Sequence, residues 1–266
     1  MKHLLSFFIC FLLISCNHKQ GLEEPEEPCN IPEGFCDGFP KIGWSCHWNP
    51  AWDYPVKPGM EEWGNQNSRE KKVAVCQIPE DILYSLSVED LTVICLQYPL
   101  LADVFAFNNM DFAINRMFEE FNGIRYLFTK NDVSKELLKH YLCVMNNFSI
   151  FDSDVSELEK GLFIISISEI EILLSCYNSQ NKDAIENSKE ILRHLLCGYE
   201  KKMEYPNYFS GHGYKINFFA RAKMINYISP ENVNELFNNY RLMFLSGDYS
   251  QEMLEIHKRF TCEIFK

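Results

Sequence analysis

Residues 132–145 read DVSKELLKHYLCVM, and this stretch sets the pattern for most of the chain. Asp132 is of a residue type that favours the first position of a helix, where its side chain accepts a backbone hydrogen bond. Leu138, Tyr141 and Leu142 follow at the three- and four-residue spacing of one helix face. The stretch therefore predicts an amphipathic helix with an apolar side.

The same arrangement of capping residue and apolar face recurs from Ile78 to Phe265. Short loops with glycine, proline or asparagine separate the segments. We therefore predict an all-α fold, a multi-helix α-α array or bundle, over residues 78–266. The expected helices begin at residue 78 and continue at 88–97, 100–107, 110–121, 124–129, 133–145, 153–177, 181–203, 214–227, 230–245 and 249–265.

Residues 29–77 differ from this helical part. They hold all four tryptophans, several prolines and no long helical pattern. We predict an irregular strap with one short helix near residues 59–66. Its cysteines are Cys29, Cys36 and Cys46, and outside the cytoplasm such cysteines tend to pair. We expect one disulfide among them, with Cys76 as another partner, while free thiols remain the alternative.

Aromatic residues crowd into residues 43–64, and two interpretations stay open. Exposed rings bind sugars or peptides, which makes this region a candidate binding surface. Alternatively, the rings pin the strap across the helical body, since each buries about 150–250 Å². Residues 209–213, a Phe-Ser-Gly-His-Gly loop, are a second candidate surface or a plain connection. The candidate binding residues of the strap are Trp44, His47, Trp48, Trp52, Asp53 and Tyr54.

The first sixteen residues predict export. Lys2 precedes an apolar run from Leu4 to Ile14, which ends at Ser15 and Cys16. A positive start and an apolar run of about 7–15 residues are typical of a signal peptide. The ending resembles a bacterial lipobox, which implies cleavage after residue 15 and acylation of Cys16. An ordinary signal peptide is the alternative.

Residues 16–28 alternate glutamate with proline and predict an extended acidic tether. At about 3.3 Å per residue, the tether reaches roughly 40 Å from a membrane. Acidic residues after a lipidated cysteine also resemble the surface-export signal of Bacteroidota lipoproteins. The body is thus expected to face either the periplasm or the outside of the outer membrane.

Charge and motifs exclude several classes of protein. The net charge is −12, and it becomes −13 without residues 1–15, whose one charged residue is Lys2. An acidic chain does not suit nucleic acid, whose phosphates require a basic patch. The chain has no zinc-protease, lipase, P-loop or dinucleotide motif. We therefore expect no catalytic residue, cofactor or metal, and we interpret helical cysteines such as Cys143 and Cys197 as small apolar residues.

Several short motifs carry a family resemblance. They are WDYPVKPG at 52–59 with Glu62-Trp63, CQIPE at 76–80, LQYPL at 96–100 and FNG at 121–123. Together with the lipobox they resemble a group of uncharacterised lipoproteins from gut Bacteroidota. The resemblance implies a helical protein of the cell envelope and implies no activity.

Two functions follow as expectations. The first is a binding or scaffold module, which is anchored to the envelope by its lipid and binds a protein or glycan partner. The second is a hydrolase of surface polymers, which needs two carboxylates about 5–10 Å apart in a helical cleft.

Overall fold

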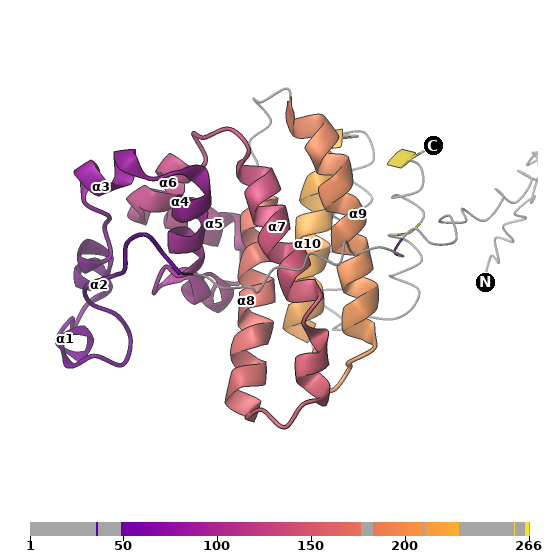
Figure 1. Ribbon diagram of the computed structural model, residues 1–266, viewed down its shortest axis with the longest axis horizontal. Coiled ribbons are helices and arrows are strands. Elements are labelled where there is room, and N and C mark those ends of the chain that lie inside the picture. Colours follow the sequence, from indigo (N-terminus) through magenta and orange to yellow (C-terminus); the bar gives the residue numbers. More distant parts are fainter. Residues whose placement is uncertain are drawn as a thin grey trace, which may run out of the picture.

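The computed structural model describes residues 49–176, 183–209 and 211–228, together with Cys36, Lys258, Ile264 and Phe265. These residues are mostly helical and include no strand, which confirms the all-α prediction. Figure 1 shows a group of short helices beside an upright bundle of four longer ones. Among the described residues, no helix is both long enough and apolar enough to cross a bilayer.

The short helices form the first part of the described chain. α2 lies within residues 29–77, which we predicted to be irregular apart from one short helix near residues 59–66. The prediction is therefore wrong for residues 69–75, which are helical. α1 is the short helix expected near residues 59–66. The elements are α1 (Glu61–Gly64), α2 (Arg69–Val75), α3 (Glu80–Ser85), α4 (Val88–Leu96), the 3-10 helix η1 (Leu101–Ala106), α5 (Met110–Glu120) and α6 (Asn122–Leu127).

The second part is a four-helix bundle whose successive helices run in opposite directions (Figure 1). Its elements are α7 (Val133–Met145), the 3-10 helix η2 (Phe148–Asp152), α8 (Glu157–Ser175), α9 (Asp183–Met203) and α10 (Gly211–Ile228). Both α7 and α10 pack against α8 and α9, so the four helices surround one interior. The predicted helices at 230–245 and 249–265 lie almost wholly outside the described residues.

Side-chain caps begin several helices, and the helices after Ser87 and Asn109 start where the sequence predicts them. Ser87, Asn109 and Ser156 each accept a hydrogen bond from the backbone N–H three residues further on. Ser156 and Glu159 bind each other's backbone reciprocally, which satisfies two donors at the start of α8. The predicted helix at 153–177 therefore begins later, at Glu157, and it continues through Gly161 without a break.

Asp132 stands before α7 as predicted, but its side chain does not cap the helix. Its backbone is left-handed, with φ at 63°. In this conformation the carboxylate binds the ammonium group of Lys135 at 2.7 Å instead of a backbone N–H. The loop expected at residues 209–213 is not a loop throughout, because its last three residues belong to α10, which begins at Gly211.

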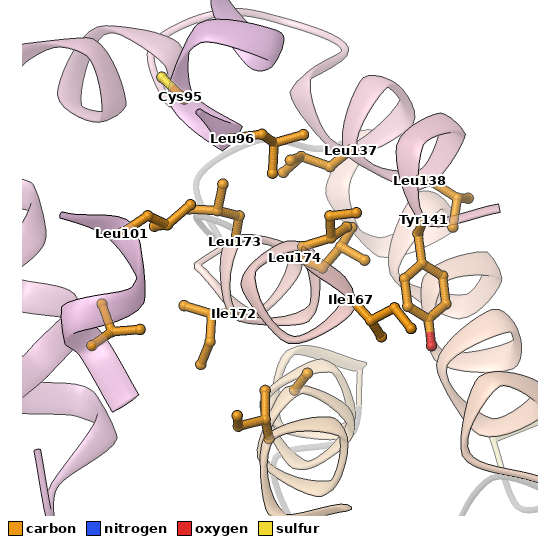
Figure 2. Packing of buried hydrophobic residues seen from close by; sticks show 14 of the residues in the cluster. Cys95, Leu96, Leu101, Leu137, Leu138, Tyr141, Ile167, Ile172, Leu173 and Leu174 are labelled. Atoms are coloured by element: carbon orange, nitrogen blue, oxygen red, sulfur yellow. The ribbon is translucent and has the colours of Figure 1, made fainter. Parts of the chain in front are cut away.

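α8 occupies the centre of the hydrophobic core. Its second half is buried almost all round, as expected for a helix that is apolar on every side. In Figure 2, Leu173 of α8 points toward Leu101 of η1, and Leu96 of α4 lies against Leu137 of α7. The core is thus continuous from the short helices into the bundle.

A reciprocal set of hydrogen bonds joins two segments that are far apart in sequence. The N–H of Ile78 donates to Asn122 Oδ1 at 3.1 Å, and Asn122 Nδ2 donates to the Ile78 carbonyl at 2.8 Å. The N–H of Asn122 donates to Gln77 Oε1 at 3.1 Å, and Gln77 Nε2 donates to the Glu120 carbonyl at 2.9 Å. We call this set the Gln77–Asn122 clamp. It satisfies backbone groups before α3 and at the start of α6.

Aromatic rings pack beside this clamp. Tyr98 and Phe121 stack with their ring centroids 4.0 Å apart and their planes 2° from parallel. The ring of Tyr54 lies 6.3 Å from that of Phe121. A Cβ on Gly123 would approach Ile78 Cδ1 to 2.8 Å, so only glycine fits there without a shift. The motifs at 52–59, 76–80, 96–100 and 121–123 therefore meet in one packed region.

We expect Asn122→Ala to lower the free energy of unfolding by about 1–3 kcal/mol, because it leaves the backbone groups of Ile78 without partners. Urea unfolding followed by circular dichroism measures the change. Asn131→Ala, at an exposed position before α7, is the matched control and should stay within about 0.5 kcal/mol of the wild type. Equal effects of the two substitutions would contradict a stabilising clamp.

Candidate functional site

The predicted binding residues of the strap divide into two groups. Trp44, His47 and Trp48 lie outside the described residues, as does the predicted lipid-attachment residue Cys16. Trp52, Asp53 and Tyr54 are described. The structure therefore bears on the binding surface only through these last three residues.

Tyr54 belongs to the core and not to an exposed surface, which corrects its place among the candidate binding residues. It is 3% exposed, and its hydroxyl donates to the carbonyl of Ile94 on α4 at 2.9 Å. Burial raises the pKa of Tyr54 well above its usual value. Trp52 is half-buried and packs edge-to-face on Tyr54 with the centroids 4.8 Å apart. Here the packing interpretation of the strap fits better than the binding interpretation.

Asp53 remains exposed and binds Lys57 Nζ at 2.6 Å. The hydrogen bond from Lys57 lowers the pKa of Asp53. Trp63 is half-buried and packs against the core, and the ammonium group of Lys72 lies 5.2 Å from its ring centroid. Asp53 is therefore accessible to solvent, whereas the Trp63 ring contributes to packing.

The disulfide of Cys36 corrects the predicted pairing. Cys36 bonds to Cys197 of α9, 161 residues further on, and not to another cysteine of the strap. Cys76, the alternative partner, is a buried free thiol. Cys29 and Cys46 lie outside the described residues. In the chain-entropy view, a loop of this length removes about 5 kcal/mol of unfolded-state entropy.

Cys143 is also disulfide-bonded. The interpretation of Cys143 and Cys197 as small apolar residues is therefore wrong for both. The bond also excludes Cys143 as a nucleophile beside His140, because its sulfur is not a free thiol. Burial lowers the pKa of His140 to about 4, so its imidazole is neutral at neutral pH. Within the described residues, no group of His, Cys, Asp and Glu side chains could hold a metal.

The strongest candidate site is a cluster of polar side chains inside the bundle, which sequence reasoning missed. All four bundle helices contribute to it, and each of its members is at most 2% exposed. We call it the buried charged cluster. Its members are Tyr141 of α7, Glu171 of α8, Tyr199 and Lys202 of α9, and Asn217 and Arg221 of α10.

Glu171 is the acceptor at the centre of the cluster. Lys202 Nζ donates to both of its oxygens at 2.6 and 2.7 Å. Tyr141 Oη donates to Oε1 at 3.0 Å, and Asn217 Nδ2 donates to the same oxygen at 2.6 Å. Burial lowers the pKa of Lys202, while the Glu171 carboxylate opposes this shift. The short ion pair and its hydrogen bonds offset the cost of burying both charges.

Local sequence places these groups on facing helix sides. Asn217 and Arg221 are four residues apart and share one face of α10. Gly198 lets the Tyr141 hydroxyl pass close to α9, because a Cβ at this position would overlap that oxygen. The carbonyls of Leu195 and Gly213 accept from Asn217 Nδ2 at 3.0 Å and from Lys202 Nζ at 3.2 Å.

Arg221 is the unsatisfied member of the cluster. Its Nε, Nη1 and Nη2 atoms are buried without a hydrogen-bond partner in the described part of the chain. The guanidinium carbon lies 4.5 Å from the ring centroid of Tyr199, a distance typical of a cation–π contact. Burial lowers the pKa of Arg221 to about 10, which still leaves it charged at neutral pH.

A sequence signal for the cluster exists in hindsight. Glu171 interrupts the apolar run of α8 between Ile170 and Ile172, and Arg221 stands between Ala220 and Ala222. A charged residue within an apolar run is a candidate for a buried, paired position.

No family model, curated protein or solved structure matches the chain. Its function is therefore inferred from its own residues.

We expect Glu171→Gln to lower the free energy of unfolding by about 3–5 kcal/mol. Glutamine keeps the shape of the side chain but leaves Lys202 as a buried charge without its ion-pair partner. Chemical unfolding measures the loss. Glu190→Gln removes a carboxylate that is 60% exposed on α9 and should change stability by less than about 0.5 kcal/mol. Similar small losses in both variants would show that the cluster does not depend on this charge.

Proposed function

We propose that the chain is a lipid-anchored protein of a bacterial cell envelope whose helical body is a binding module for a protein or glycan partner. The anchor rests on residues 1–16, where a positively charged and apolar segment leads to the lipobox-like cysteine Cys16. The acidic tether then holds the body away from the membrane, at the outer membrane and facing either the periplasm or the outside.

The disulfide between Cys36 and Cys197 carries the export part of the proposal. Disulfides persist in oxidising compartments such as the bacterial periplasm or the cell surface, and they are rare in the cytosol. Cys143 supports the same conclusion, because it too is disulfide-bonded. The disulfides therefore support export and have no bearing on lipidation.

Exposed apolar side chains on α8 support a binding role for the helical body. Leu158, Leu162 and Ile165 are 73%, 54% and 38% exposed and recur at helical spacing along α8. Exposed apolar side chains that cluster in this way are typical of proteins with partners. Glu171, the fully buried carboxylate of the described residues, is held by Lys202 and is thus not free for acid–base chemistry.

The hydrolase remains a second candidate because of one residue, Glu169 of α8. It is half-buried, and burial raises the pKa of its carboxyl group to about 8. A carboxyl group that keeps its proton at neutral pH suits a general acid. Glycoside hydrolysis needs a second carboxylate alongside. A hydrolase would need a second carboxylate beside Glu169, whereas a binding role needs no pair of carboxylates, so we favour the binding role.

Replacing Cys16 tests the anchor. We expect Cys16→Ala to abolish labelling of the chain by a fatty-acid probe in a bacterial host and to leave uncleaved precursor, because the acylated sulfur is gone. Gel electrophoresis with probe detection measures both effects. Cys10→Ala, inside the apolar run, is the matched control and should be labelled normally. Undiminished labelling of Cys16→Ala would refute the lipid attachment.

Cross-linking in intact cells tests the choice between binding and hydrolysis. We expect the tagged chain to recover the same protein or glycan partner whether or not it carries Glu169→Gln, because binding does not need that proton. Mass spectrometry of the adducts is the measurement. Turnover of an envelope polymer that Glu169→Gln abolishes would instead support the hydrolase.

A further inference from the structure

The guanidinium group of Arg221 is buried and makes no hydrogen bond to the described residues around it. The guanidinium has five N–H donors and a permanent charge, and it is 0% exposed. None of its three nitrogens has a hydrogen-bond partner among the described residues. Leaving such a group unpaired costs several kcal/mol, and native proteins rarely do so. An unpaired buried guanidinium therefore indicates an absent acceptor.

The charges of the buried charged cluster indicate that the acceptor for Arg221 is negatively charged. Among the buried members, Glu171 contributes one negative charge, whereas Lys202 and Arg221 contribute two positive charges, so the cluster holds an excess of one positive charge. Glu200, the other carboxylate whose charge favours the charged form of Arg221, is partly exposed and is paired with Lys258 at 3.1 Å. Glu171 is already engaged by four hydrogen bonds from Lys202, Tyr141 and Asn217. A water molecule would satisfy N–H groups but would leave the excess charge. An anion satisfies both.

Two aromatic rings lie beside the guanidinium group of Arg221 and restrict its position. Tyr199 lies 4.5 Å and Phe218 6.0 Å from the guanidinium carbon, measured to the ring centroids. One helical turn earlier, Asn217 Oδ1 is also buried without a donor among the described residues. The cluster therefore offers a positioned fork of donors and one acceptor nearby on the same face of α10.

We propose that the buried charged cluster binds a small oxyanion, a carboxylate or a phosphate, through the guanidinium of Arg221. The planar fork of arginine matches two oxygens of either group, and such charge-assisted pairs are stronger than neutral ones. The anion cancels the excess positive charge inside the bundle. Because the guanidinium is enclosed, the ligand is a small molecule and not a polymer or a protein surface.

This site is independent of the membrane anchor and of the partner proposed above. Its ligand binds between the four bundle helices, whereas an envelope partner contacts the outside of the body. Failure of lipid labelling at Cys16 would leave the anion site intact. Absence of anion binding would in turn leave the anchor and the outer partner untouched.

Equilibrium urea unfolding of the full chain in detergent, with its disulfides intact, tests the proposal. Sodium acetate and sodium phosphate are the probes, and sodium chloride at equal ionic strength is the reference. Above the dissociation constant, each tenfold rise in the free concentration of the anion that binds should add about 1.4 kcal/mol to the free energy of unfolding. Unfolding equilibria suit an enclosed site, because slow ligand entry does not alter the midpoint.

Arg221→Met is the decisive variant. It removes the unpaired charge, so after dialysis into anion-poor buffer it should be more stable than the wild type, and added acetate or phosphate should not stabilise it beyond chloride. Arg221→Lys keeps the charge without the fork and should lose at least tenfold in anion affinity. Arg116→Gln, which removes a partly exposed arginine of α5, should keep the wild-type response.

Three results would overturn the proposal. The first is a wild-type midpoint that is the same in acetate, phosphate and chloride. The second is an Arg221→Met variant that responds to the anions as the wild type does. The third is an Arg221→Met variant that is less stable than the wild type, or unfolded, in anion-poor buffer. A response to only one probe would identify the anion as a carboxylate or as a phosphate.

Discussion

The ion pair between Glu171 and Lys202 lies at the centre of the bundle, and the packing of all four bundle helices depends on it. Tyr141 of α7 and Asn217 of α10 donate to the same carboxylate. One buried acid thereby fixes the relative positions of α7, α8, α9 and α10. Apolar side chains alone would tolerate small shifts between helices, whereas buried charges tolerate few positions because unpaired charges are costly in a low dielectric. The ion pair thus specifies one arrangement of the bundle.

The short helices rely on the Gln77–Asn122 clamp and on the stacked rings of Tyr98 and Phe121 beside it. These residues belong to the short sequence motifs at 76–80, 96–100 and 121–123. The motifs satisfy backbone groups and fill the core in this part of the molecule. Arg69 of α2 adds an ion pair to Glu120 of α5 at 2.8 Å.

The disulfide from Cys36 to Cys197 connects the strap to the bundle beside the charged cluster, since Cys197 lies on the same helix as Tyr199 and Lys202. The bond that holds the strap to α9 requires an oxidising environment. The arrangement places the cluster in a covalently restrained part of the molecule. A restrained interior is suited to holding a small ligand in a fixed geometry.

The sequence by itself determined the helices and most of their starts, because capping residues and apolar spacing act over one or two turns of chain. Ser87, Asn109 and Ser156 begin their helices as local chemistry requires. Only the tertiary structure decided the partner of Cys36, the burial of Tyr54 and the pairing of Glu171 with Lys202. These contacts join residues about 30 to 161 positions apart, and their partners depend on how whole helices pack. Spacing along one helix indicates which face is buried, but it does not indicate which distant charge that face will meet.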